Sequence, residues 1–291
     1  GYQALFLAGG ASLEFLMTPY NLMQENGKAA YLDSGTWASA AIKEAKFFGE
    51  TVVVASSKDE NYNYVPKGYS VPADADYFHC TSNNTIFGTQ MKEFPSLDMP
   101  IVCDMSSDIF SRVLDFSKFD IIYAGAQKNM GPAGTTLVII KEDILGKNGR
   151  VIPSMLDYAK HIKAESMYNT PPVFPVYASL QTLKWLKNLG RIAAIEKINN
   201  AKAALIYSEI DRNPLFKGAA VVEDRSNMNA TFLLNDPLHA DIFNAMLKEA
   251  GIIGLPGHRS VGGYRASMYN ALPLESVQVL VDVMQELEGN V

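Results

Sequence analysis

Residues 121–140, with the sequence IIYAGAQKNMGPAGTTLVII, place a single lysine between two apolar runs. Residues 121–123 and 135–140 read as strands, because β-branched residues favour buried strands. The segment between them contains Lys128 and several Gly and Pro residues, which favour a turn. An amine held between buried strands is poorly hydrated, so we expect its pKa to fall and the neutral amine to attack aldehydes. A lysine on an exposed surface turn is the alternative, and this stretch alone leaves both open.

Composition limits the function classes. The chain has 291 residues, of which 48% are hydrophobic and 19% charged, with a net charge of -6. This size suits one large domain plus a smaller one. An acidic excess argues against a nucleic-acid partner. No apolar run is long enough to span a bilayer and no signal peptide opens the sequence, so we expect no membrane partner and a cytoplasmic location.

The cysteines and histidines do not form a recognisable metal-binding pattern. Cys80 and Cys103 each lie in or beside an apolar, strand-like run, which indicates buried, reduced thiols in a cytoplasmic protein. There is no CxxC pair, and the four histidines are scattered. We therefore expect no structural metal site.

Strand-like and helix-like segments alternate in the first half of the chain, which predicts an α/β fold with a largely parallel sheet flanked by helices. The expected strands are residues 29–33, 51–55, 77–80 and 101–103, with a helix over 38–48. The second half predicts a small α+β unit. Its expected helices are residues 173–188, 192–211, 236–250 and 276–287, and its expected strands are 229–234 and 265–269.

Several expected strands end in residues that can bind a ligand, as the strands of open α/β sheets do. Asp104 follows a buried strand, where a carboxylate needs a partner, although capping the next turn would also explain it. Trp37 offers a flat aromatic face at a helix start, or is simply a core tryptophan. Thr85 lies in a polar segment after another strand. The turn GGAS at residues 9–12 could hold a phosphate at a helix N-terminus, although alone it is a weak signal.

Together these residues match the requirements of pyridoxal phosphate. A lysine binds its aldehyde, a carboxylate keeps the pyridine nitrogen protonated, an aromatic face stacks on the ring, and N–H and hydroxyl donors hold the phosphate. A dinucleotide-binding dehydrogenase would need a GxGxxG turn, which GGAS does not match.

The chain resembles the phosphoserine aminotransferase family, within the aspartate aminotransferase superfamily of fold-type-I pyridoxal-phosphate enzymes. The matching motifs run in order across nearly the whole chain and are specific together. They are GGAS at Gly9, SGTWAS at Ser34, SNNTIFG at Ser82, CDMSSDIFSR at Cys103, YAGAQKNMGPAG at Tyr123, MYNTPP at Met167 and GHRSVGGYRASMYNALPLE at Gly257. The resemblance implies a large cofactor-binding domain with a mostly parallel sheet of the seven-stranded type, residues 1–188, and a smaller C-terminal α+β domain, residues 189–291.

The resemblance also implies residue roles. Lys128 would form the internal aldimine and move the α-proton, and Asp104 would pair with the pyridinium nitrogen. Trp37 would stack on the ring. The remaining cofactor contacts would come from Ala11, Ser12, Thr85 and Gln127.

Substrate recognition and assembly follow from the same resemblance. Arg265 would grip the substrate carboxylate, which suits a guanidinium fork, and His258 with Arg259 would receive the phosphate of phosphoserine. Asn169 and Thr170 would reach the cofactor phosphate of a neighbouring subunit in a homodimer. Two prolines stiffen this loop, and the polar stretch before it, residues 157–165, is not expected to be core.

The implied reaction converts O-phospho-L-serine and 2-oxoglutarate into 3-phosphooxypyruvate and L-glutamate in serine biosynthesis. Whether 4-phosphohydroxythreonine of pyridoxine biosynthesis is also a substrate stays open. The family is usually several dozen residues longer at its N-terminus, where a further substrate arginine lies. Either more chain precedes these residues, or the protein is truncated. An aminotransferase for an unphosphorylated amino acid and a truncated, non-catalytic homologue are the alternatives.

Overall fold

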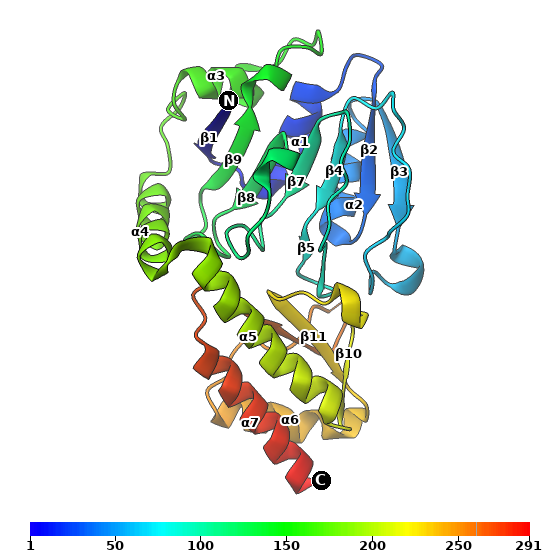
Figure 1. Ribbon diagram of the computed structural model, residues 1–291, viewed down its shortest axis with the longest axis vertical. Coiled ribbons are helices and arrows are strands. Elements are labelled where there is room, and N and C mark those ends of the chain that lie inside the picture. Colours follow the sequence, from blue (N-terminus) through cyan, green and yellow to red (C-terminus); the bar gives the residue numbers. More distant parts are fainter. Residues whose placement is uncertain (260) are drawn as a thin grey trace.

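The computed structural model describes residues 1–259 and 261–291, which form two lobes (Figure 1). The large lobe contains a seven-stranded sheet in the order β1-β9-β8-β7-β4-β2-β3. The small lobe contains a three-stranded sheet, β10-β11-β12, with helices α5 to α7 packed beside it. The boundary predicted between residues 188 and 189 stays a prediction, although α4 does give way to α5 at Gly190, where the backbone turns with φ 111°.

The large sheet is mostly parallel, as predicted from the alternation of strands and helices. Strands β3, β2, β4, β7 and β8 are paired in parallel, while β9 is antiparallel to both β8 and β1. The strands span Tyr2–Leu7 (β1), Lys28–Asp33 (β2), Glu50–Ser56 (β3), Phe78–Thr81 (β4), Ile101–Asp104 (β7), Ile121–Gly125 (β8) and Thr136–Lys141 (β9). Strands β2, β4, β7 and β8 are buried at nearly every position. Parallel strands buried on both faces read as largely apolar runs, which is why the sequence located these four well.

Helices cover one face of this sheet, and mainly loops cover the other. Helices α1 (Gly10–Leu22), α2 (Thr36–Ala45) and α3 (Tyr158–Lys163) pack one hydrophobic cluster against β1, β2, β8 and β9. The second cluster includes residues from the segments 65–75, 91–99 and 105–119, which are mainly loops, with Leu183 of α4 (Val173–Leu189) at its margin. A hairpin of β5 (Asn83–Asn84) and β6 (Thr89–Gln90) extends from β4 toward the small lobe.

The small lobe agrees with the predicted α+β pattern. Its elements are α5 (Arg191–Arg212), β10 (Phe216–Gly218), β11 (Asn229–Leu234), α6 (Ala240–Glu249), β12 (Tyr264–Ser267) and α7 (Leu274–Asn290). All three strands are antiparallel. The sequence did not predict β10, which is short and has only one buried residue, Phe216.

The expectation that residues 157–165 lie outside the core is wrong in part. Tyr158 is fully buried in the cluster under α1, and His161 is buried too. The hydroxyl of Tyr158 donates to Glu14 Oε2 of α1 over 2.5 Å. The polar residues of this stretch misled the prediction because they line a short helix whose other side packs against the sheet.

Cys80 and Cys103 are free, buried thiols and face each other as register partners in β4 and β7. Among the described residues, no group of three or more His, Cys, Asp or Glu side chains could hold a metal ion. No helix in this part of the chain is long and apolar enough to cross a membrane.

Candidate active site

The candidate functional residues follow four neighbouring strands at one edge of the large sheet. Strands β8, β7, β4 and β2 are adjacent and parallel, so their carboxyl ends share an edge. Lys128 follows β8, Asp104 ends β7, Thr85 follows β4, and Trp37 follows β2. This edge faces the small lobe, so these residues lie between the two lobes (Figure 1). Open α/β sheets bind ligands at this position.

Lys128 is partly buried just beyond β8. Burial lowers the pKa of its ammonium, the negative charge of Asp104 partly opposes that effect, and the positive charge of Arg265 lowers the pKa further. The lysine is therefore more readily neutral than a surface lysine, which is the state that attacks an aldehyde. The alternative of a solvated turn lysine does not fit this environment.

Asp104 is 4% exposed at the end of β7. Burial raises the pKa of its carboxyl, while hydrogen bonds from Ser106 and the charge of Lys128 lower it. Its Oδ1 accepts from the backbone N–H of Ser106 over 2.9 Å, so the local turn that the sequence also allowed is present. A cationic partner, such as a protonated ring nitrogen, would favour the ionised carboxylate at this buried position.

Trp37, Thr85 and Arg265 are joined by hydrogen bonds. The indole Nε1 of Trp37 donates to Oγ1 of Thr85 over 3.3 Å. Nη1 of Arg265, on β12 of the small lobe, donates to the carbonyl of Thr85 over 3.3 Å. Trp37 is 38% exposed, so its ring is not a core side chain and is available to a ligand.

A close approach of backbone and side chain precedes Trp37. A Cβ on Gly35 would lie 2.3 Å from Nδ2 of Asn84, which donates to the carbonyl of Ser34 over 2.6 Å. A side chain at position 35 would therefore have to displace the buried amide of Asn84. This contact ties the start of α2 to the β5–β6 hairpin and so helps to place Trp37 beside Thr85.

Helix α1 begins with an uncapped N-terminus. Gly9 is its N-cap in the left-handed region, with φ 108°, and no side chain caps the first turn. Ala11 and exposed Ser12 lie in that turn, where free N–H groups and the helix dipole favour an anion. Gln127 is exposed beside Lys128.

The remaining predicted residues lie in exposed loops. His258 and Arg259 are exposed in a turn before β12, in which the carbonyl of His258 accepts from the N–H groups of Val261 and Gly262. Asn169 and Thr170 are exposed between α3 and α4, and Asn169 Nδ2 donates to the adjacent carbonyl of Thr170 over 3.4 Å.

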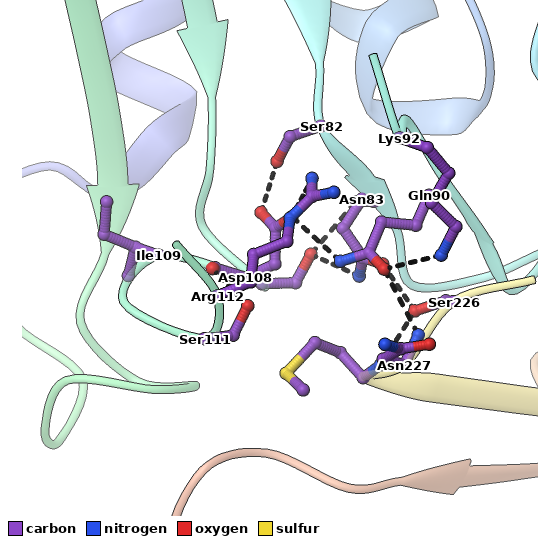
Figure 2. Close-up of polar contacts among 12 residues, drawn as sticks. Ser82, Asn83, Gln90, Lys92, Asp108, Ile109, Ser111, Arg112, Ser226 and Asn227 are labelled. Carbon is purple, nitrogen blue, oxygen red and sulfur yellow. Dashed lines mark hydrogen bonds and ion pairs between the residues drawn. The ribbon is translucent and has the colours of Figure 1, made fainter. Parts of the chain in front are cut away.

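Asp108 is a second buried carboxylate near the site that the sequence reasoning missed (Figure 2). It accepts from Ser82 Oγ, and from Gln90 Nε2 and Arg112 Nη2 over 3.1 Å each. Its negative charge raises the pKa of Asp104 and opposes the lowering at Lys128. Asp108 was part of the motif CDMSSD, but its effect on the pKa values of Asp104 and Lys128 became visible only with its burial in the structure.

Comparison with known proteins identifies the family. A model of the class-V aminotransferases matches residues 2–280. The phosphoserine aminotransferase of Flavobacterium psychrophilum is 81% identical over 291 residues, covering 100% of this chain and 82% of that protein. That of Parabacteroides distasonis is 60% identical, covering 99% and 81%.

Comparison with solved structures points to the same family as the sequence comparisons. The phosphoserine aminotransferase of Bacillus circulans subsp. alkalophilus superposes with a TM-score of 0.96 at 44% identity, covering 100% of this chain and 81% of that one. The pyridoxal-phosphate-bound phosphoserine aminotransferase of Trichomonas vaginalis superposes with a TM-score of 0.92 at 37% identity, covering 98% and 82%. This chain therefore belongs to the class-V aminotransferases and, within them, to the phosphoserine aminotransferase family.

Proposed function

We propose that this chain binds pyridoxal phosphate covalently through Lys128 and transfers the amino group of O-phospho-L-serine to 2-oxoglutarate. The products are 3-phosphooxypyruvate and L-glutamate, in serine biosynthesis. The observation that carries the proposal is the pair of Lys128 and Asp104 at the carboxyl ends of adjacent parallel strands, where burial lowers the pKa of the lysine.

The residues present fit this cofactor. Asp104 supplies a buried carboxylate for the ring nitrogen, and the exposed indole of Trp37 supplies a stacking face. The uncapped first turn of α1, with Ala11 and Ser12, supplies donors for the phosphate. Thr85 and Gln127 add polar contacts around the ring. When bound, pyridoxal phosphate withdraws electrons from the α-carbon of an amino acid.

The protein's own groups then complete the reaction. Lys128 would act as the base that takes the α-proton of the amino acid and gives it back at the former aldehyde carbon of the cofactor, which suits an amine of lowered pKa. The guanidinium of Arg265 grips the substrate carboxylate in a bidentate manner. His258 and Arg259 bind the substrate phosphate. Their turn directly precedes the strand that carries Arg265, so one loop and one strand bind both ends of phosphoserine.

We place the enzyme in the cytoplasm as a homodimer whose Asn169 and Thr170 reach the partner's cofactor phosphate. Large apolar side chains support the dimer: Met167, Val173, Phe174 and Tyr177 are each more than half exposed along the loop and the start of α4. Such a patch marks a protein interface. The free thiols of Cys80 and Cys103 suit a reducing compartment.

Absorbance and peptide mapping test the cofactor assignment. The protein supplied with pyridoxal phosphate should develop a visible band that borohydride removes, and the reduced adduct should map to Lys128. An adduct on another lysine would contradict the assignment, and no band at all would favour a non-catalytic homologue.

Arg259 discriminates the proposed substrate from an unphosphorylated amino acid. Arg259→Ala should reduce kcat/KM for phosphoserine by about ten- to a hundredfold, as expected for a lost charged hydrogen bond, and should leave glutamate turnover much less affected. Equal losses with both substrates would favour an enzyme for unphosphorylated amino acids.

A further inference from the structure

Three buried asparagines from three separate elements converge on the turn that follows Asp104. Asn129 lies next to Lys128, Asn199 lies in α5, and Asn270 lies three residues after β12. All three are nearly inaccessible to solvent. Only Asn129 belongs to the large lobe; the other two belong to the small lobe. No role in the reaction described above requires any of them.

The asparagine amides bind a series of main-chain carbonyls in the turn of residues 107–111. Nδ2 of Asn129 donates to the carbonyls of Ser107 over 3.3 Å and Ile109 over 3.2 Å. Asn270 Nδ2 donates to the carbonyl of Phe110 over 3.1 Å. Asn199 Nδ2 donates to the carbonyl of Ser111 over 2.9 Å.

The asparagines are also bonded to one another. Oδ1 of Asn129 accepts from the backbone N–H of Asn270 over 2.9 Å. Because a backbone N–H can only donate, this contact fixes which end of the Asn129 amide faces the turn. Oδ1 of Asn270 accepts from Asn199 Nδ2 over 2.9 Å. The three side chains therefore form one connected network that joins the lobes.

The turn they hold is conformationally strained. Phe110 has φ 58°, in the left-handed region that is costly for a bulky residue. Such a backbone persists only where the surroundings fix it. On the small-lobe side, Lys202 of α5 donates to the carbonyls of Met268, Tyr269 and Leu272 over 2.9–3.0 Å, and so fixes the loop that contains Asn270.

A second set of contacts between the lobes is made by Asn83, whose Oδ1 accepts a hydrogen bond from Ser226 Oγ of the small lobe (Figure 2). Asn83 Nδ2 donates to Ser107 Oγ over 2.8 Å and to Asn229 Oδ1 over 2.9 Å, so β5 contacts both the same turn and β11. Residues of both lobes therefore hydrogen-bond to the turn after Asp104. One of them, Asn129, is adjacent to Lys128.

We propose that Asn129, Asn199 and Asn270 form an asparagine clamp that positions Arg265 relative to Lys128 and Asp104. Asn129 joins the lysine loop to the Asp104 turn, and Asn270 joins that turn to the end of the strand carrying Arg265. They are positioning residues that touch neither substrate nor cofactor. The consequence for the reaction rests on the proposed function, in which Arg265 binds the substrate carboxylate.

A kinetic comparison tests the clamp against a purely structural role. Asn270→Ala should raise the KM for glutamate about fivefold, as expected for a loosened hydrogen-bonded contact, while the Kd for pyridoxal phosphate stays within about twofold. Asn129→Ala should also lower kcat about tenfold or more, because small misplacement of a reacting group is costly.

Asn213→Ala is the matched control. Asn213 is equally buried, donates to the carbonyl of Met284 and accepts from the N–H of Leu215, all within the small lobe. It should lower the melting temperature without changing the KM for glutamate or kcat. If Asn270→Ala changes the KM no more than this control does, the clamp has no positioning role.

Hydrogen exchange gives two further tests, the first of which needs no variant. In the wild-type holoenzyme, saturating maleate, an unreactive dicarboxylate, should slow amide exchange in residues 264–272 and 105–112 together. Protection of residues 264–272 alone would overturn the proposal. In cofactor-free protein, Asn270→Ala should speed exchange in residues 105–112 while Asn213→Ala does not. A wild-type enzyme without phosphoserine turnover would refute the proposed substrate, whereas this cofactor-free comparison would still decide on the clamp.

Discussion

The indole Nε1 of Trp37 donates a hydrogen bond to Oγ1 of Thr85 over 3.3 Å. The bond fixes the tilt of a half-exposed ring that follows β2 by attaching it to the segment that follows β4. If this ring stacks on a ligand, the restraint favours binding, because the orientation of the ring is set before the ligand arrives and less conformational entropy is lost.

This bond can be tested through cofactor affinity. Trp37→Phe keeps an aromatic face but loses the donor, and should weaken pyridoxal phosphate binding about fivefold, the value of one net hydrogen bond. Thr85→Val keeps the shape but loses the acceptor, and should cost more because we propose that Thr85 also contacts the cofactor. In titrations of the cofactor-free proteins, the double variant should lose less than the sum of both effects. Strict additivity would mean that the two residues act independently.

Asp104→Asn tests the role of the buried carboxylate. The amide has the same shape but cannot carry the charge that stabilises a protonated ring nitrogen. Loss of one partner from a buried charge pair costs about 3–5 kcal/mol. We therefore expect kcat to fall by at least a hundredfold, while borohydride reduction still labels Lys128. Near-normal turnover in the asparagine variant would remove Asp104 from the catalytic assignment.

Glu14 controls a pH-dependent part of the stability. Burial raises the pKa of its carboxyl from 4.5 to about 7, against a smaller lowering by the hydrogen bond from Tyr158. Between these two pH values the folded chain keeps a proton that the unfolded chain has lost, so the free energy of unfolding from this group falls as pH rises from 4.5 to 7.

Glu14→Gln should remove this dependence, since the amide oxygen still accepts from Tyr158 without becoming charged. Above pH 7 the variant should be more stable than the wild type by up to about 3 kcal/mol, because each tenfold change in proton affinity is worth about 1.4 kcal/mol. At pH 4.5 the two should be nearly equal. Urea unfolding at both pH values measures the difference, and a gap that is independent of pH would argue against titration of Glu14.

The extent to which the sequence predicted this structure depended on the range of the interactions. Strands β7 and β8 and their polar ends were found because a buried strand and the residue after it are local features. Lys128 and Asp104 therefore emerged from the sequence itself, before any family resemblance. Motif order then supplied residues such as Thr170, whose roles remain predictions because no feature of a single chain tests them.

The asparagine clamp could not be found in this way. Asn270 donates to the carbonyl of Phe110, 160 positions away in the sequence. Because every residue has a backbone carbonyl, the residue type at position 110 does not reveal this contact. The burial of Tyr158 was missed for a related reason: its partner, Glu14, lies 144 positions away, and a carboxylate does not indicate a core contact.

Subunit mixing tests the shared active site. Lys128→Ala removes the lysine of a chain, and the double substitution Asn169→Ala with Thr170→Ala removes the two donors that we propose reach the partner's cofactor phosphate. The side chains of Asn169 and Thr170 are exposed, on a loop that continues into the apolar start of α4. In a heterodimer of the two variants, one site carries both defects and the other carries neither. Mixing two weak homodimers should therefore restore activity to a fraction of sites.

The controls for this experiment are the two parents, each mixed with itself, and a tagged pull-down that shows subunit exchange. The restored sites should also regain the cofactor affinity of the wild type, because only they combine an intact lysine with an intact partner loop. If subunits exchange and neither activity nor affinity returns, each site is built from one chain, and the exposed Asn169 and Thr170 form an ordinary surface loop. A fully active monomer would lead to the same conclusion directly, since the loop of a single chain would then have no partner cofactor to reach.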